Sequence, residues 1–285
     1  MKNKLLIFIL LLYFQGFGQS VPNTNTFSLQ DVVNVTGGND LIEAFSLATG
    51  TFDPLYEGSK NSLLNFRNYQ AIIPYVDVKY GYLYNHYAFL NPLGITADGW
   101  VIPSTTQWDI LFNYLTASVA GGKMKMTGLT YWNTPNTGAT NEVGFNAKGG
   151  GYRLPSSGNF ISLLNHAVIA SSTVDGLYNT FATWIRYNSS IGSIASWNNN
   201  LGMSLRALKV STTLTNGQTG IYVGNDGKIY RTICIGTQEW VSCNLVETKY
   251  RDGSLIPEVT TNAAWMALTT GARCVFNNLE SNAYE

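Results

Sequence analysis

The sequence predicts a mixed α+β domain, and three observations support this fold class. Residues 104–115 carry apolar side chains at helical spacing, which predicts an amphipathic helix. Residues 204–210 and 229–235 alternate in the way that is typical of strands. Glycine-rich segments without a clear period fill residues 120–160, and long loops of this kind are often functional.

The helix at 104–115 has a start signal and a buried face. Ser104 and Gln107 form a capping-box pattern at its beginning. Its apolar positions are three or four residues apart, and they are Trp108, Leu111, Phe112 and Leu115. This spacing places them on one side of the helix, where they can contribute to a core.

A second, shorter helix is expected at 262–270. Thr261 or Asn262 can cap its first turn, and Gly271 stops it. Before it, a Gly-Asn-Asp-Gly turn at 224–227 opens the strand at 229–235, and a polar linker at 211–220 joins that strand to the one at 204–210.

The N-terminal residues are predicted to be an export signal. Two lysines precede a ten-residue apolar run at 5–14, and Gly16 and Gly18 fit a signal-peptidase site. We therefore expect a signal peptide over residues 1–18 and a secreted or cell-surface protein. The alternative is an N-terminal membrane anchor, but a helix needs about 20 apolar residues to span a bilayer.

Residues 19–74 are expected to form a small helical segment. Capping-box patterns and closing glycines predict short helices at 28–37 and 40–50, and an ordered connector follows at 51–70. The segment is too small to hold a large core, so it docks on a neighbour or serves as an attachment piece. The main domain is then expected at 75–285.

Composition excludes some classes of partner. Charged residues make up only 12% of the chain and the formal net charge is zero, so we expect neither nucleic-acid binding nor attraction to an anionic membrane. The chain has 17 Tyr, 7 Trp and 28 Gly. This composition is typical of β-rich extracellular proteins that bind through rings and amides.

The three cysteines allow at most one disulfide. Cys234 and Cys243 lie on the two arms of a predicted hairpin, but counting from the turn places Cys234 opposite Glu239. We favour buried free thiols. A bridge from Cys274 to Cys234 or to Cys243 is the alternative.

No arrangement of residues indicates catalysis. His86 and His166 are the only histidines, and neither has a serine or cysteine nucleophile near it in the sequence. No Cys/His cluster has the spacing of a zinc site. We therefore expect no catalytic residue, no cofactor and no metal ligand.

Several long motifs resemble one known family. Residues 226–278, which begin "DGKIYRTICIGTQEW", resemble the front half of the Fibrobacter succinogenes major paralogous domain, which is common in secreted and surface proteins of Bacteroidetes. Residues 80–115, 121–153 and 204–210 resemble its back half. Together the motifs cover about 75–285, but the back half precedes the front half.

The resemblance implies a C-type-lectin-like fold, in which the first and last strands lie side by side. If the strand at 204–210 is the family's last and the strand at 226–235 its first, the chain is one circularly permuted domain. Two incomplete domains, or a strand donated between subunits, are the alternatives. A contact between the strands at 229–235 and 205–210 within one molecule would favour permutation.

In folds of this kind the ligand-facing loops come just before the last strand, which directs attention to residues 165–200. Rings there can stack on a sugar, and amides and hydroxyls can bond to it. The candidate ligand-binding residues are Tyr178, Asn179, Tyr187, Asn188, Ser189, Ser190, Trp197, Asn198 and Asn199. For each, packing inside the domain is the alternative. Calcium-dependent sugar binding is unsupported, because "SWNNN" at 196–200 lacks an acidic residue.

The sequence therefore predicts a non-catalytic module that recognises a surface polysaccharide, glycoprotein or other receptor. The first alternative is a structural or adhesive component, such as a surface appendage or a phage tail or fibre protein. Such a component could assemble as a homo-oligomer. Residues 50–69 resemble phage structural proteins of Bacteroidetes hosts. The second is an enzyme like the formylglycine-generating oxidases, but these need a reactive cysteine pair and calcium, which the three cysteines do not match.

Overall fold

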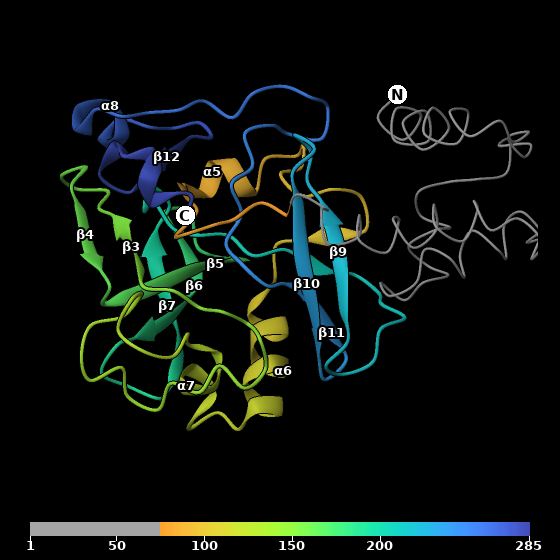
Figure 1. Cartoon of the computed structure of the whole chain (residues 1–285). Helices are drawn as coiled ribbons and strands as arrows, with labels where there is room; N and C mark the ends of the chain where they lie inside the picture. The colour runs from red at the N-terminus through yellow and green to blue at the C-terminus, as the bar shows by residue number, and fades with distance from the viewer. Residues whose placement is uncertain (1–74) are drawn as a thin grey trace, which may run out of the picture. The chain divides into compact units, whose positions relative to one another are not determined.

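Three β-sheets and a few short helices make up residues 75–285, the part of the chain that the computed structural model describes (Figure 1). This β-rich arrangement agrees with the expected mixture of strands and helices. The predicted signal peptide at 1–18, the helices at 28–37 and 40–50 and the connector at 51–70 lie outside the described residues.

The first sheet has five strands in the order β2, β8, β11, β10, β9, and its neighbours are antiparallel. Its strands are β2 (Trp100–Val101), β8 (Leu208–Lys209), β9 (Thr219–Val223), β10 (Ile229–Ile235) and β11 (Gln238–Val241). β9 and β10 form a hairpin, closed by a hydrogen bond of 2.8 Å from the Gly224 amide to the Lys228 carbonyl. β9 thus takes up the end of the predicted polar linker at 211–220.

The second sheet has five strands in the order β4, β3, β5, β6, β7, and only β3 and β5 are parallel. Its strands are β3 (Gly150–Arg153), β4 (Phe160–Leu163), β5 (His166–Asp175), β6 (Asn179–Arg186) and β7 (Gly192–Asn198). The prediction of loops over 165–200 is wrong for most of that segment. Its apolar side chains, such as Ile169 and Ile185, alternate into a core, which favours strands.

The third sheet pairs β1 (Tyr82–Tyr84) with β12 (Arg273–Val275). The α-helices are α5 (His86–Phe89), α6 (Thr105–Leu115), α7 (Ala120–Met124) and α8 (Asn262–Met266), and two single 3-10 turns follow at Phe276–Asn278 and Glu280–Asn282. The predicted helix α6 is confirmed, together with its Ser104/Gln107 capping box. α8 has the expected Thr261 cap but ends earlier than predicted, where the Asn200 side chain binds the Leu268 carbonyl.

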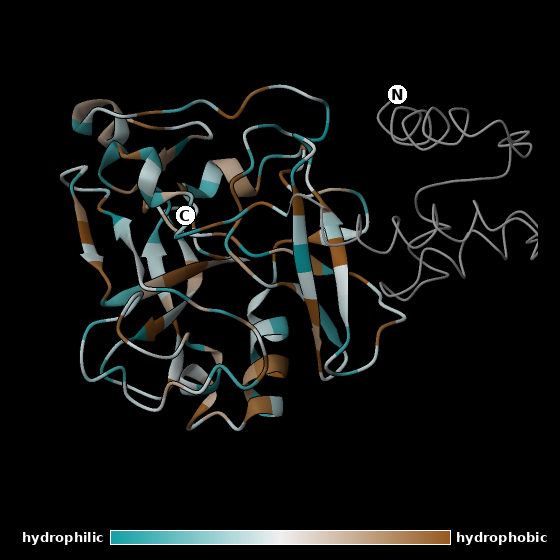
Figure 2. Ribbon diagram, viewed as in Figure 1, coloured by the Kyte–Doolittle hydropathy of each residue, from teal (hydrophilic) through white to brown (hydrophobic). Residues whose placement is uncertain are grey.

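Helix α6 lies between the two five-stranded sheets, and its apolar face joins them (Figure 1). Figure 2 shows the contrast between the apolar and polar sides of this helix. The rings of Trp108 and Trp240 are 4.7 Å apart in this core. Burial of each large apolar side chain contributes about 1.5 to 3 kcal/mol, so α6 anchors both sheets. Trp108, which the helical spacing assigns to the core, is buried, and so are Trp100, Trp132 and Trp240.

The expected direct contact between the strands at 229–235 and 205–210 is wrong, because β11 lies between them. Residues 205–207 instead accept hydrogen bonds from the Val241 and Leu245 amides, at 3.0 and 2.9 Å. The hairpin of β10 and β11 therefore closes on its own chain. The alternation at 204–210 does not separate a polar from an apolar face, since residues 205–208 are all buried.

The two ends of the described domain lie side by side. Val78 pairs with Tyr284, and the Glu285 amide donates a hydrogen bond of 3.1 Å to the Asp77 carbonyl. Circular permutation requires ends that lie this close together. The arrangement is therefore compatible with the permuted order that the motifs imply.

All three cysteines are free thiols, as favoured from the sequence, although Cys243 is only partly buried. Cys234 lies opposite Glu239, as the hairpin count predicts.

Within residues 75–285, no helix combines the length and the apolar character that crossing a bilayer requires.

Candidate functional site

The nine candidate ligand-binding residues fall into two groups at opposite ends of β6 and β7. Asn179 pairs with Asn198 at one end, and Ile185 pairs with Gly192 at the other. At about 3.3 Å per residue, the strand between these pairs is about 20 Å long. One group is Tyr178, Asn179, Trp197, Asn198 and Asn199, and the other is Tyr187, Asn188, Ser189 and Ser190. A single sugar ring cannot contact both.

The group at 187–190 forms a turn whose backbone surrounds a buried lysine. The Lys125 ammonium donates hydrogen bonds to the carbonyls of Thr137, Arg186 and Ser189 at 2.9, 3.0 and 3.0 Å. The Ser190 carbonyl accepts a further bond from α7. Burial lowers the pKa of Lys125 to about 8, so the side chain carries its charge at pH 7. The contacts of this turn are those of a structural element, and Asn188 is the only exposed residue among 187–190.

At the other end, the turn between β5 and β6 is exposed and held in place from beneath. Leu177 and Tyr178 are 85% and 74% exposed. Asn199 is only 5% exposed. Its amide donates to the Tyr178 carbonyl at 2.8 Å, and its side chain donates to the Leu177 carbonyl at 3.1 Å. Asn199 therefore positions the turn, and Tyr178 is available to a ligand.

Trp197 belongs to a cluster of four rings on one face of the second sheet. Neighbouring ring centroids are 5.2 to 6.0 Å apart, and the rings are those of Tyr152, His166, Trp184 and Trp197. Burial and the nearby Arg186 lower the pKa of His166, so the imidazole is neutral at pH 7. The contacts of Trp197 favour packing over ligand binding.

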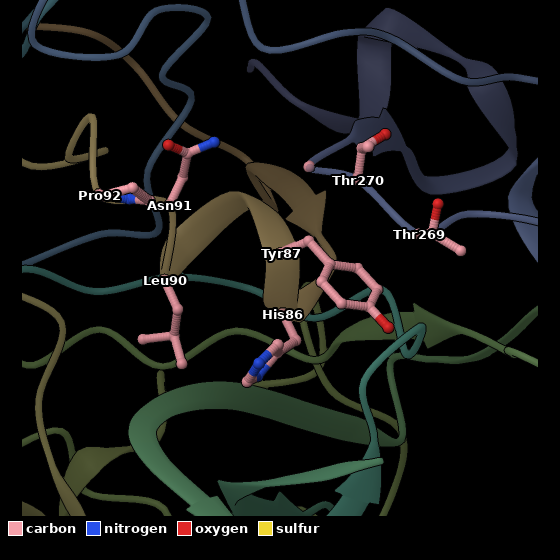
Figure 3. A pocket seen from close by; sticks show the side chains of 8 residues that line it. His86, Tyr87, Leu90, Asn91, Pro92, Thr269 and Thr270 are labelled. Atoms are coloured by element: carbon pink, nitrogen blue, oxygen red, sulfur yellow. The ribbon is translucent and has the colours of Figure 1, made fainter. Parts of the chain in front are cut away.

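A pocket that the sequence did not reveal opens near the Tyr178 end of the sheet. It has a volume of about 340 Å³ and lies between α5 and the segment that leads into β12 (Figure 3). Its lining residues are His86, Tyr87, Leu90, Asn91, Pro92, Thr269, Thr270 and Gly271. The sequence predicts no catalytic role for His86 and a helix stop at Gly271, and the other six residues carry no signal of a site.

One buried side chain ties the two walls of the pocket together. Asn85 caps α5 by accepting a bond from the Ala88 amide at 3.1 Å, and the same oxygen accepts one from the Ala272 amide at 2.9 Å. Its nitrogen donates to the Thr270 carbonyl at 2.8 Å. Gly271 permits this close approach, because a side chain there would lie 2.9 Å from the Ala88 Cα.

The pocket and the Tyr178 turn are connected through Asn199 and Asn200. The His86 amide donates to the Asn199 carbonyl at 2.9 Å. The Asn200 side chain donates to the Leu268 carbonyl at 2.8 Å, next to the second pocket wall. Backbone and amide hydrogen bonds therefore place the pocket and the exposed turn at one end of the domain.

The chemistry of the pocket is neutral. None of the eight lining residues is acidic, a lysine, an arginine or a cysteine. Burial lowers the pKa of His86, and its Nδ1 atom is buried without a hydrogen-bond partner within residues 75–285, which leaves Nε2 as the nitrogen that a ligand can reach. No group of three His, Cys, Asp or Glu side chains in this part of the chain is arranged to hold a metal ion. Rings, hydroxyls and an amide are what the pocket offers.

Comparison with known proteins identifies the family. The model of the Fibrobacter succinogenes major domain matches residues 57–209, more than half of the sequence, so the chain belongs to this family. Membership indicates a surface or adhesion-type module. No curated protein and no solved structure matches the chain. The match ends at the last residue of β8, and the likeness of residues 226–278 to the family's front half remains a prediction.

Proposed function

We propose that this chain is a secreted or cell-surface, non-catalytic module that recognises a surface glycan or receptor through the pocket between α5 and residues 269–271. The observation that carries the proposal is the pocket itself, which combines two rings with hydroxyls and an amide and has no charged group in its lining. Such a mixture suits recognition of a polar, uncharged surface. The exposed Tyr178 lies at the same end of the domain and extends the contact surface.

We also propose that the domain is a C-type-lectin-like fold in permuted order. Two observations support this proposal. The family match stops at β8, and β8 pairs with β11 of the segment that resembles the family's beginning. The close approach of Glu285 to Asp77 provides the junction that the usual order would need. Export rests on the N-terminal residues 1–18 alone.

A second candidate function is that of an adhesive or structural component that assembles with protein partners. The observation that favours it is the apolar tip of the β5–β6 hairpin, where Val174 and Leu177 are exposed. Light scattering after size-exclusion chromatography separates the two functions. A stable oligomer that dissociates in a Leu177→Ser variant would favour assembly, and a monomer would favour the binding module.

The proposed function is tested by binding of the full chain to a glycan array and to cell envelopes. We expect binding to at least one of them and a loss of at least about tenfold in affinity for Tyr87→Ala, which removes a ring from the pocket. Tyr114→Ala is the matched control, because Tyr114 is an exposed tyrosine on α6 and does not line the pocket. Absence of binding to both surfaces, or equal losses in both variants, would contradict the proposal.

A further inference from the structure

The size of the pocket limits what it can hold. Its volume of about 340 Å³ is at the lower end of the range of about 300 to 1,000 Å³ that is usual for small-molecule sites. It is also partly open to solvent and lies between a four-residue helix and a short connecting segment. A single ring of a longer molecule fits such a site better than an extended peptide does.

Three hydroxyls in the lining are available to a ligand, whereas the Asn91 side-chain oxygen already accepts a hydrogen bond of 3.0 Å from the Leu93 amide. Within residues 75–285, the hydroxyls of Tyr87, Thr269 and Thr270 make no hydrogen bond to the protein. Thr269 and Thr270 are exposed, and Figure 3 shows the Tyr87 ring directed toward their side of the pocket. The lining thus offers a flat ring and free hydroxyls, and a sugar presents an apolar C–H face and equatorial hydroxyls to match them.

The electrostatics of the pocket select against a charged ligand. A carboxylate that enters must lose part of its hydration, and without a cation the few hydroxyl donors of the lining offset only part of that cost. The only titratable side chains in the lining are His86 and Tyr87. Burial lowers the pKa of His86, and within residues 75–285 its buried Nδ1 has no acceptor for a second proton, so the imidazole is neutral at pH 7. An uncharged sugar incurs no comparable cost.

We infer that the pocket binds one neutral sugar ring of a glycan, stacked on Tyr87 and hydrogen-bonded by Thr269 and Thr270, and that it rejects sugars that carry a carboxylate. This inference rests on the proposed function and specifies its ligand class. Asn85 is a positioning residue in this site, since it contacts both walls but not the pocket itself.

The test uses the full chain and two matched panels of immobilised oligosaccharides. One panel ends in neutral hexoses or N-acetylhexosamines, and the other ends in uronic or sialic acids. We expect binding to members of the neutral panel alone, with affinity unchanged between about 0.05 and 0.5 M salt, because no charge pair contributes. Stronger binding to the acidic panel, or binding that salt abolishes, would overturn the inference.

Variants locate the binding at the pocket without relying on loss of folding. We expect Tyr87→Phe to retain binding, because the ring is kept, and Tyr87→Ala to weaken it about tenfold or more. Thr270→Val keeps the shape of the side chain and should weaken binding several-fold through the loss of one hydrogen bond. Equal affinities for wild type, Tyr87→Ala and Thr270→Val would overturn the inference.

The outcomes separate this inference from the proposed function. Binding to cell envelopes through a protein receptor, with no binding to either oligosaccharide panel, would overturn the neutral-sugar assignment and leave the binding module standing. Absence of binding to the envelopes and to both panels would overturn both. Binding to the neutral panel that depends on Tyr87 supports both.

Discussion

Replacing Glu247 with glutamine should remove a measurable pH dependence from the stability of this domain. Glu247 is fully buried. Its carboxylate accepts a hydrogen bond of 2.8 Å from the Tyr230 hydroxyl, and Asp226 is close by. Burial, with a smaller contribution from the negative charge of Asp226, raises the pKa of Glu247 to about 7. The folded protein therefore favours the protonated acid.

The magnitude follows from the difference between folded and unfolded states. The pKa rises from 4.5 to about 7, a difference of about 2.5 pH units, and at about 1.4 kcal/mol per unit this corresponds to about 3 kcal/mol. Because the folded-state pKa is the higher one, the contribution is complete below pH 4.5 and is lost as pH rises through 7. Ionisation of Glu247 therefore destabilises the domain at neutral pH.

Urea unfolding of wild type and Glu247→Gln between about pH 4.5 and 8 measures this effect. The difference between the two unfolding free energies should change by about 3 kcal/mol over that range, in the direction that favours the variant at high pH. The lowered pKa values of His86 and His166 act in the opposite direction, but they are common to both proteins and cancel in the difference. Glu142→Gln, at an exposed ion pair with Lys123, is the control. Parallel pH profiles for wild type and Glu247→Gln would refute the reasoning.

Other predictions follow from the buried lysine, the chain order and the pocket wall. Lys125→Met should lower the unfolding free energy by about 3 to 5 kcal/mol, measured in urea, because the carbonyls around the Lys125 ammonium lose their donor. A loss below about 1 kcal/mol would contradict this. A chain opened between the exposed residues Val210 and Ser211, with Glu285 joined to Asp77 by a short glycine linker, should give an unchanged circular dichroism spectrum and cooperative unfolding. An unfolded product would count against permutation. Gly271→Ala should reduce both the unfolding free energy and the affinity for ligand, because the new Cβ would lie 2.9 Å from the Ala88 Cα. Unchanged ligand binding in this variant would show that this pocket wall is not part of the binding site.

Local signals in the sequence were sufficient for the elements that depend on local structure. Helix α6 combines a capping box with a regular apolar face, and both lie within twelve residues of sequence. The pairing of Cys234 with Glu239 follows from counting outward from a tight turn. Such features need no knowledge of the remaining chain, and for that reason they could be predicted.

The second sheet and the β8 region could not be predicted in the same way. Residues 205–208 are buried on every side, so their alternation carried no information about faces or partners. β5, β6 and β7 contain many small and polar residues that resemble loop composition, and they become strands because α6 covers one face of the meander. Tertiary packing decided both cases.

The pocket could not be predicted because its walls are distant in sequence. Asn85 and Thr270 are 185 residues apart and meet through one hydrogen bond. Nothing local distinguishes Tyr87 or Asn91 from ordinary helix and loop residues. Conversely, the turn at 187–190 has the composition of a binding loop but encloses Lys125, a residue that the sequence places in a glycine-rich loop.

Hydrogen–deuterium exchange with and without a bound glycan tests the central claim most directly. The ligand is the neutral oligosaccharide that binds best in the panel experiment, and the protein is the full chain. The site described above predicts slower amide exchange at residues 86–92 and 268–272 and at the Tyr178 turn, with no change at 187–191. Slower exchange at 187–191 alone, or an unchanged pattern at saturating glycan, would contradict it.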